Sequence, residues 1–308
     1  MLYRPANRGF TLIELMIALV IGLVTLSAAL SFATSTYRTF TGSKVREEVY
    51  RSARFIGMSM ERDFQGTGVA IGRTPSFGTL AAWGDTIMIL QVPFEPNEAP
   101  PYDLDPTAGA ATDPMPPGGT CGATCVDLLK DVNGNFEISA GHLARLQVAG
   151  ERRLILVQGV TDNGTTSSLW FTSVPYIMHY DAGLSAGLLL DRNSTFVQKL
   201  HPIIYYRDGT QLYRAQSFNL DGTPDGHLIS EGVQSFEVKV VFVDGDEADE
   251  ANSADMDDTN DYDDVVGIRI SATVAADRVD PHVKNGQLFT RNYEWRFAPR
   301  NLMYELNR

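Results

Sequence analysis

The feature that most constrains this chain is an uncharged run of 23 residues, 15–37, close to its N-terminus. The first part of the run, LMIALVIGLVTLSAAL, is almost wholly apolar. At about 1.5 Å of rise per helical residue the run reaches ~35 Å, enough to cross a hydrocarbon layer of ~30 Å. Arg4 and Arg8 precede it, so the positive-inside rule keeps the short leader in the cytoplasm. The sequence predicts a single N-terminal membrane span followed by an extracytoplasmic domain.

The composition limits the classes of partner and of chemistry. The chain has 308 residues, with 25 Lys and Arg against 38 Asp and Glu, a formal net charge of −13. This balance argues against binding to phosphate backbones, so we expect no direct nucleic acid binding. The five His stand alone in the sequence, and there is no nucleophile-elbow, phosphate-loop or His-Glu-x-x-His motif. We therefore expect a protein that is not an enzyme and requires no cofactor.

A carboxylate stands at the edge of the apolar run, where a simple anchor has no use for it. Glu14 directly precedes the run, and an acid inside a bilayer costs about 2.5–3.5 kcal/mol on insertion scales, so such a residue is functional by default. If the chain is cut after Gly9, the new α-amine of Phe10 is a cation four residues from Glu14. That amine can neutralise the Glu14 carboxylate of a neighbouring copy. The alternatives are a plain anchor with an incidental Glu, or a secretory cleavage site near Ala29.

The segment RGFTLIELMIALVIGLV resembles the class III (prepilin) signal of type IV pilins and pseudopilins. That signal has a short basic leader, a Gly before the cut, an aromatic or apolar first residue and a Glu at the fifth position. The resemblance implies that a prepilin peptidase cuts between Gly9 and Phe10, that Phe10 is N-methylated, and that Glu14 is the assembly glutamate. It implies residence in the inner membrane and then in a pilus on the cell surface. In this family Pro commonly interrupts the helix, whereas here Gly22 is the only weak point.

Beyond the apolar run, apolar residues continue at helical spacing on one face. They are Val45, Val49, Ala53, Ile56, Met60 and Phe64. We expect a leader at 1–9, a transmembrane helix half at 10–38, an amphipathic helix half at 39–65 that packs on the domain, and a β-rich globular domain at 66–308. Two separate helices broken near 39–43 are the alternative. Gly66 and Gly68 are expected to end the helix.

The rest of the chain favours short β-strands separated by turn residues. The expected strands are 86–92, 143–148, 153–157, 169–174, 197–206, 211–215, 233–243, 265–274 and 287–297. Asp208-Gly209 predicts a tight hairpin within 205–213, because Gly tolerates the positive φ of such a turn. The predicted fold is α+β, with one long N-terminal helix packed on a mainly antiparallel sheet.

Three later segments resemble the PilW family of minor pilins: IIYYRDGTQLYRAQSF, LISEGVQSFEVKVVFVDGD and DDVVGIRISATV. This resemblance implies a structural subunit that helps to initiate assembly of a type IV pilus and is incorporated into the pilus or its tip complex. The implied partners are the major pilin, other minor pilins and a tip adhesin. A J-class minor pseudopilin of type II secretion is an alternative, because it has the same N-terminal signal. An extended loop at 93–120 and an acidic loop at 244–264 depart from the compact family pattern.

Two cysteines follow the Pro-rich loop 93–120 in a C-x₃-C spacing. In an oxidising compartment we expect a disulfide between Cys121 and Cys125, which would brace the loop end. A ring this small adds only about 2 kcal/mol in the chain-entropy account. A redox pair usually has a C-x-x-C spacing, and a zinc site would need two further ligands from the scattered His.

A segment after these cysteines has oxygen-bearing side chains at alternate positions, as a calcium loop requires. The candidate ligands are Asp131, Asn133, Asn135, Glu137 and Ser139. Phe136 stands where the sharp turn of such a loop needs Gly, and His142 stands where a bidentate Glu closes the shell. A turn rich in Asp, Asn and Gly is therefore the alternative to Ca²⁺. Together with the acidic loop, this segment leaves open a third functional class, a calcium-dependent adhesin-like module on a pilin anchor.

Overall fold

The computed structural model describes residues 11–75, 77–93, 100–105, 124–148, 151–173, 194–251 and 260–302. Helix α1 runs without interruption over Leu12–Phe64, 53 residues, and no Pro occurs in this segment to break it. The alternative of two helices broken near 39–43 is wrong. The helix ends just before Gly66 and Gly68, and Gly68 has a φ of +75°, a conformation that Gly adopts without strain.

The strands of the described residues form two sheets. Their bounds are β1 (Leu80–Trp83), β2 (Thr86–Gln91), β3 (Pro101–Asp103), β4 (Cys125–Leu129), β5 (Leu143–Val148), β6 (Glu151–Asp162), β7 (Thr166–Ser173), β8 (Phe196–Asp208), β9 (Gln211–Phe218), β10 (Pro224–Glu231), β11 (Val233–Phe242), β12 (Glu247–Ala248), β13 (Val265–Ala275) and β14 (Thr290–Phe297), with a 3₁₀ turn η1 (Lys284–Gly286) before β14. The strand pairs β1–β2, β2–β8, β3–β8, β4–β7, β5–β6, β5–β8, β6–β7, β8–β9, β9–β10, β11–β12 and β11–β13 are antiparallel. The predicted α+β class is confirmed.

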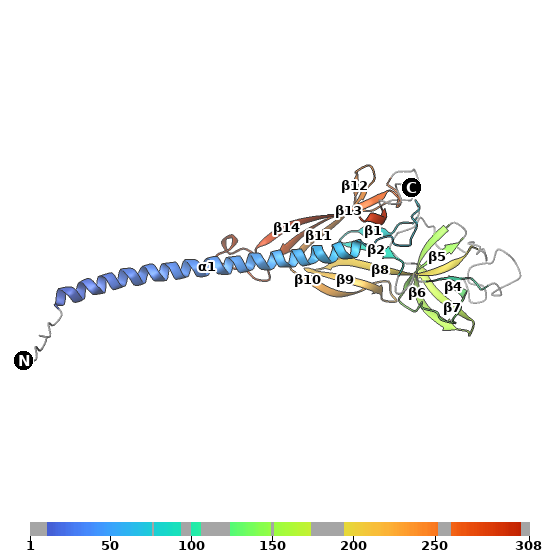
Figure 1. Cartoon of the computed structure of the whole chain (residues 1–308), viewed down its shortest axis with the longest axis horizontal. Helices are drawn as coiled ribbons and strands as arrows, with labels where there is room; N and C mark the ends of the chain where they lie inside the picture. Colours follow the sequence, from blue (N-terminus) through green and yellow to red (C-terminus); the bar gives the residue numbers. More distant parts are fainter. Residues whose placement is uncertain are drawn as a thin grey trace, which may run out of the picture. The chain divides into compact units, whose positions relative to one another are not determined.

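One part of the larger sheet has the order β1-β2-β8-β9-β10. Its β8–β9 connection is the predicted hairpin, because Asp208 pairs with Gln211 and Gly209 has a φ of +59°. The smaller sheet has the order β12-β11-β13-β14, and β11 pairs with β13 over almost its full length. Figure 1 shows β13 and β14 side by side.

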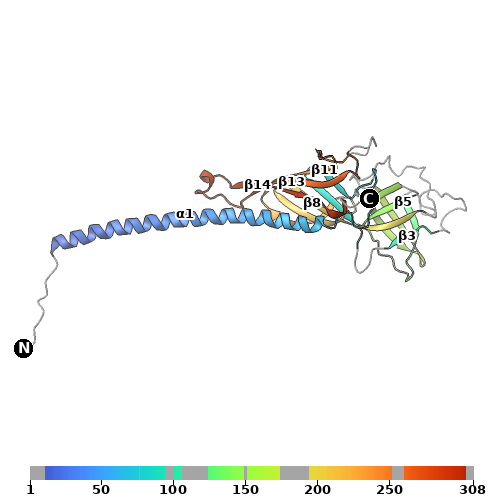
Figure 2. The same cartoon turned by 45° about the horizontal axis from the view of Figure 1, so that its top comes forward.

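A second part of the larger sheet closes on itself and is formed by the chain between β2 and β8. The N-terminal part of β8 pairs with β5 on one edge and β3 on the other, and β6, β7 and β4 follow β5. A bridge between Leu104 and Leu128 joins the end of β3 to β4. We call this closed arrangement of the strands β3 to β7 and the N-terminal part of β8 the barrel insert (Figure 2 shows its strands β3 and β5). Closure leaves fewer unpaired strand edges.

The barrel insert has an interior core of its own. This core includes Tyr102, Val126, Leu146, Val157, Leu169 and Val197. The opposite face of β5 and β6 contributes Leu143, Leu154 and Leu156 to a second core, which also contains Phe77, Met88 and Ile204. Because side chains alternate across a strand, β5 and β6 serve both cores. The insert is thus packed onto the strands β2 and β8 that flank it in sequence.

By its contacts the described chain divides into two compact units, residues 11–51 with Ala276–Thr290, and residues 52–275 with 291–302. Within the second unit, the end of α1 packs on β8, β9 and β14. The rings of Phe64 and Phe297 meet edge to face with centroids 4.8 Å apart. Ser59 and Tyr205 hydroxyl oxygens lie 3.0 Å apart. All six residues of the predicted apolar stripe, Val45, Val49, Ala53, Ile56, Met60 and Phe64, are at most 2% exposed.

Candidate assembly site at the start of the N-terminal helix

The Glu14 carboxylate folds back on the first residue before α1. Glu14 Oε2 accepts hydrogen bonds from the Thr11 backbone N–H at 3.0 Å and from Thr11 Oγ1 at 2.9 Å. In return, the Glu14 N–H donates to Thr11 Oγ1 at 3.3 Å. This reciprocal arrangement is a capping box, which satisfies N–H groups that have no partner within the helix. It sets the start of α1 at Leu12, directly after the predicted cleavage site.

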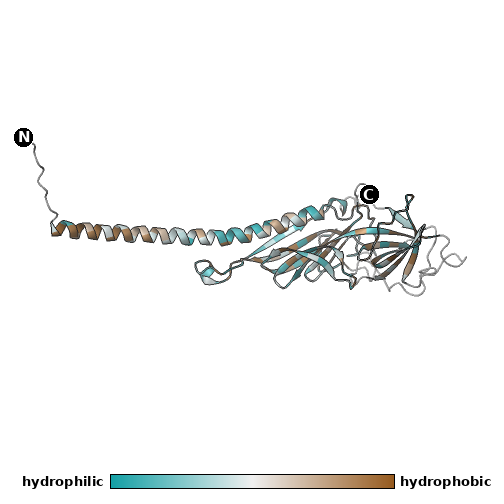
Figure 3. Cartoon of the chain, turned by 90° about the horizontal axis from the view of Figure 1, so that it is seen from below, coloured by the Kyte–Doolittle hydropathy of each residue, from teal (hydrophilic) through white to brown (hydrophobic). Residues whose placement is uncertain are grey.

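The apolar half of α1 has no cover from the rest of the chain. Every residue from 11 to 40 is exposed, and Figure 3 shows this half as predominantly hydrophobic, with hydrophilic residues increasing along the helix. Within the described residues, α1 is the one helix long and apolar enough to cross a membrane. An apolar surface of this length needs a bilayer or neighbouring helices to cover it.

Two threonine hydroxyl groups in the apolar half bond to carbonyls of their own helix. Thr25 Oγ1 donates to the carbonyls of Ile21 at 3.0 Å and Gly22 at 2.9 Å, and Thr34 Oγ1 donates to the carbonyl of Ser31 at 2.9 Å. In hydrocarbon no water is present to bind such groups, so internal bonding lets Thr occupy the span. Thr25 also bonds the helix at Gly22, the one weak point that the sequence suggested.

The other residues of the predicted processing site, Gly9 and Phe10, lie outside the described residues. The same holds for Cys121 and for most of the Pro-rich loop. Cys125 is fully buried at the start of β4, and the Cys121–Cys125 disulfide stays a prediction.

The candidate calcium loop lies between β4 and β5. Asp131 Oδ1 accepts hydrogen bonds from the backbone N–H groups of Asn133 at 2.9 Å and Asn135 at 2.6 Å, and the Gly134 N–H donates to the Asp131 carbonyl at 2.9 Å. This is the geometry of an Asx turn. Glu137 bonds through its N–H to the Tyr102 hydroxyl at 2.9 Å. The structure thus gives Asp131 a role in a turn, and Ca²⁺ binding stays a prediction.

Acids of the loop 244–264 have partners where the chain is described. Glu247 accepts from Arg269 Nε at 2.7 Å, and Asp249 pairs with Lys239 Nζ at 2.6 Å. The hydrogen bond from Arg269 lowers the pKa of Glu247. No group of three or more His, Cys, Asp or Glu side chains suited to a metal occurs in the described segments. Ion pairs with neighbouring strands, which sequence analysis did not predict, thus hold the start of this acidic stretch.

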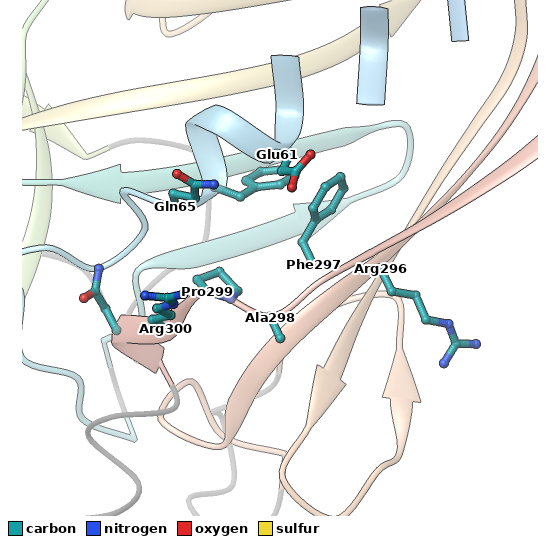
Figure 4. Close-up of a pocket in the computed structure, with 9 residues that line it drawn as sticks. Glu61, Gln65, Arg296, Phe297, Ala298, Pro299 and Arg300 are labelled. Atoms are coloured by element: carbon teal, nitrogen blue, oxygen red, sulfur yellow. The ribbon is translucent and has the colours of Figure 1, made fainter. Parts of the chain in front are cut away.

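A cavity of about 550 Å³ lies where α1 ends. Side chains of Glu61, Phe64 and Gln65 line it from the helix, and Arg296, Phe297 and Arg300 line it from the end of β14 and the segment that follows. Figure 4 shows Arg296 extending away from Glu61 and Gln65. Sequence analysis did not predict this cavity, because it forms where two segments far apart in the sequence, the end of α1 and the end of β14, come together.

Comparison with known proteins finds a family match near the N-terminus of the chain. Residues 4–30 match the family model described as the prokaryotic N-terminal methylation motif. No curated protein and no solved structure matches the chain. The matched segment contains Glu14 and Thr11 and most of the exposed apolar helix. The motif and the α+β architecture together support a type IV pilin-like protein that carries a class III prepilin signal, is processed by a prepilin peptidase and assembles with other pilins.

Proposed function

We propose that this protein is a minor pilin of the PilW type, a structural subunit that helps to initiate a type IV pilus and is incorporated into it or its tip complex. The single observation that carries the proposal is the methylation motif at 4–30 joined to an exposed apolar helix. The segments that resemble the PilW family form the β8–β9 hairpin and the strands β10, β11 and β13. Of these, β11 and β13 are paired neighbours in the smaller sheet.

The mechanism follows from charge and burial in lipid. The peptidase cuts between Gly9 and Phe10 and the new amine of Phe10 is methylated, which leaves a cation at the start of α1. In the single chain Glu14 caps its own helix through Thr11. During assembly, the Glu14 carboxylate attracts the terminal amine of a neighbouring subunit, because an isolated charge in hydrocarbon is costly and a paired one is less so. The exposed apolar helices then bundle, with the β-rich domain outside.

The proposed location is the inner membrane with the β-domain extracytoplasmic, followed by the pilus on the cell surface. The proposed partners are the major pilin, other minor pilins and a tip adhesin. The role is structural rather than enzymatic. The N-terminal motif supports the membrane location and assembly with other pilins, and the tip adhesin is proposed from the resemblance to the PilW family.

Three variants separate the charge of Glu14 from its capping role. Glu14→Ala removes both. Glu14→Gln keeps an acceptor for the Thr11 N–H but removes the charge. Thr11→Ala keeps the charge and the backbone bond to Glu14 but removes the two capping-box bonds made by Thr11 Oγ1. We expect all three in the membrane fraction, and only Thr11→Ala in sheared surface filaments. Undiminished recovery of Glu14→Gln in filaments would contradict the charge-pairing step. If Thr11→Ala is the only variant missing from the filaments, the capping bonds, and not the charge of Glu14, are what assembly requires.

A further inference from the structure

The connection between β13 and β14 lies against the part of α1 that follows the apolar run. We call residues 276–289 the membrane-proximal loop. It belongs to the same compact unit as residues 11–51. Val283 of the loop is 3% exposed, and a Cβ placed on Gly42 would lie 3.2 Å from Val283 Cγ2. Asp277 hydrogen-bonds to the Glu48 side chain, and this bond raises the pKa of Glu48. The loop therefore follows α1 between Gly42 and Glu48.

The position of the loop along α1 matches the depth of a lipid headgroup layer. Gly42 lies five residues past Tyr37, the end of the uncharged run, which is about 7.5 Å at 1.5 Å per residue. A bilayer has a hydrocarbon core of ~30 Å within a total of ~40–45 Å, so each headgroup layer is about 5–8 Å deep. When residues 15–37 fill the hydrocarbon, the part of the loop beside Gly42 stands at the headgroups. The part beside Glu48, eleven residues past Tyr37, lies about 16.5 Å from the hydrocarbon, on the aqueous side of the headgroups.

The side chains at this level have the chemistry of a membrane interface. Tyr37 and Phe40 of α1 are 67% and 57% exposed, and Trp and Tyr rings are characteristic of bilayer interfaces. Lys44 Nζ lies 4.6 Å from the centre of the Phe40 ring. On the loop, Val279 is 52% exposed. An apolar side chain held there faces solvent unless another surface covers it.

Charge at this level is opposite to that of the whole chain. Exposed basic residues are Arg38, Lys44 and Arg46 on α1 and Arg278 and Lys284 on the loop. The loop's acids are Asp277, which is bonded to Glu48, and Asp280. Lys284 Nζ donates to the neutral Thr290 hydroxyl at 3.0 Å, so its charge is not cancelled by that bond. Glu47 and Glu48 lie at this level too, and Arg278 is close enough to Glu48 to favour its charged form. Five basic residues against four acids, 5 − 4, leave an excess of one positive charge. The chain as a whole carries −13.

We propose that the membrane-proximal loop, together with Arg38, Lys44 and Arg46 of α1, forms a surface that rests on anionic lipid headgroups while the subunit resides in the membrane. The attraction acts because these cations lie within a Debye length, about 8 Å at physiological salt, of the lipid surface. This inference rests on the proposed function, which places α1 in a bilayer. The surface would have to leave the lipid when the subunit enters a filament.

The test uses the full chain in vesicles of phosphatidylcholine, with and without phosphatidylglycerol. A spin label on Val279→Cys reports contact with a water-soluble nickel chelate, and a label on Leu220→Cys, in the turn between β9 and β10, is the control probe. The same spin-labelling reaction on the unsubstituted chain measures the background signal from Cys121 and Cys125. We expect the Val279 label to be shielded from the chelate in anionic vesicles at low salt and re-exposed by high salt, with no change at Leu220.

Charge variants make the test specific. In Arg278→Gln/Lys284→Gln the shielding by anionic lipid should disappear, whereas Arg62→Gln/Arg300→Gln, with the same change in net charge, should retain it. Equal chelate contact at Val279 in both vesicle types, in protein that floats with the vesicles, would overturn the inference and leave the proposed function intact. Protein that fails to float with either vesicle would contradict membrane residence and so both proposals.

Discussion

Arg214 Nε on β9 donates to the Asp63 carboxylate in the last turn of α1 at 2.6 Å. The Tyr205 hydroxyl donates to the same Asp63 oxygen at 2.5 Å, and all three residues are buried. Burial, together with the bond to the Asp63 carboxylate, raises the pKa of Tyr205, which therefore keeps its proton. A charge pair removed from water persists only if its bonding is satisfied. The pair fixes where the end of α1 meets β8 and β9.

Replacing Asp63 with Asn removes the counter-charge and leaves the Arg214 guanidinium buried. We expect the free energy of unfolding to fall by about 3 kcal/mol, the low end of the cost of breaking a buried pair. Urea unfolding of the purified chain measures this, with Glu61→Gln, a change at an exposed acid two residues before Asp63, as the control. The control should change stability by less than about 0.5 kcal/mol. Equal losses for the two variants would mean that the buried pair has no special role.

Gly57 permits α1 to approach β14. A Cβ at this position would overlap the indole of Trp295, so Gly57→Ala should destabilise the chain even though Ala favours an exposed helix by about 1 kcal/mol relative to Gly. In a Trp295→Leu background the same substitution should be neutral or stabilising. A double-mutant cycle in thermal unfolding checks the coupling. Additive effects would show that the two residues do not constrain each other.

His142 should make stability fall on acidification. Burial, helped by the positive charges of Lys199 and His201, lowers the pKa of His142 to about 4, and His142 Nδ1 accepts from the Ser139 N–H at 3.1 Å. An unfolded His has a pKa near 6.5, so between pH ~6.5 and ~4 the unfolded chain binds a proton that the folded chain does not. Stability should decrease through this window as the pH falls. In a plot of the free energy of unfolding against pH, His142→Gln should remove this decrease. His282→Gln, a change at an exposed position, should leave it in place.

Asp131 should stabilise its turn without calcium. Asp131→Ala removes an acceptor of two backbone hydrogen bonds, at a cost of about 1 kcal/mol for each net bond. If the turn is the whole role of Asp131, the melting temperature of the native chain is the same with Ca²⁺ and with a chelator. A rise with Ca²⁺ that Asp131→Ala abolishes would instead establish the calcium loop.

Local patterns predicted much of the fold. Helical spacing predicted the buried face of α1, and the strand expected at 143–148 is β5 as observed. The expected strands did not include residues 224–231. The structure has β10 there, Pro224–Glu231, and Pro is tolerated at the start of this edge strand. Strand β1, LAAW, lacks β-branched residues, and β4 follows a Pro-rich loop. Closure of the barrel insert depends on long-range pairing, which no local pattern reveals.

The assembly site was predictable in part. The acid at the edge of the apolar run identified Glu14, but its bond to Thr11 was missed, although Thr-x-x-Glu before an apolar run is a capping-box pattern. The pair Asp63 and Arg214 is separated by 151 residues, so only the fold brings it together. The membrane-proximal loop is likewise identified by its contact with α1, because its sequence alone is an ordinary polar connection.

The central claim is that this chain is processed as a prepilin, and the mature N-terminus measures it most directly. Intact-mass and N-terminal peptide analysis of protein purified from its native membrane should show a chain that begins at Phe10 and carries one methyl group on its α-amine. A chain that retains residues 1–9, or one that begins near residue 30, would contradict the account.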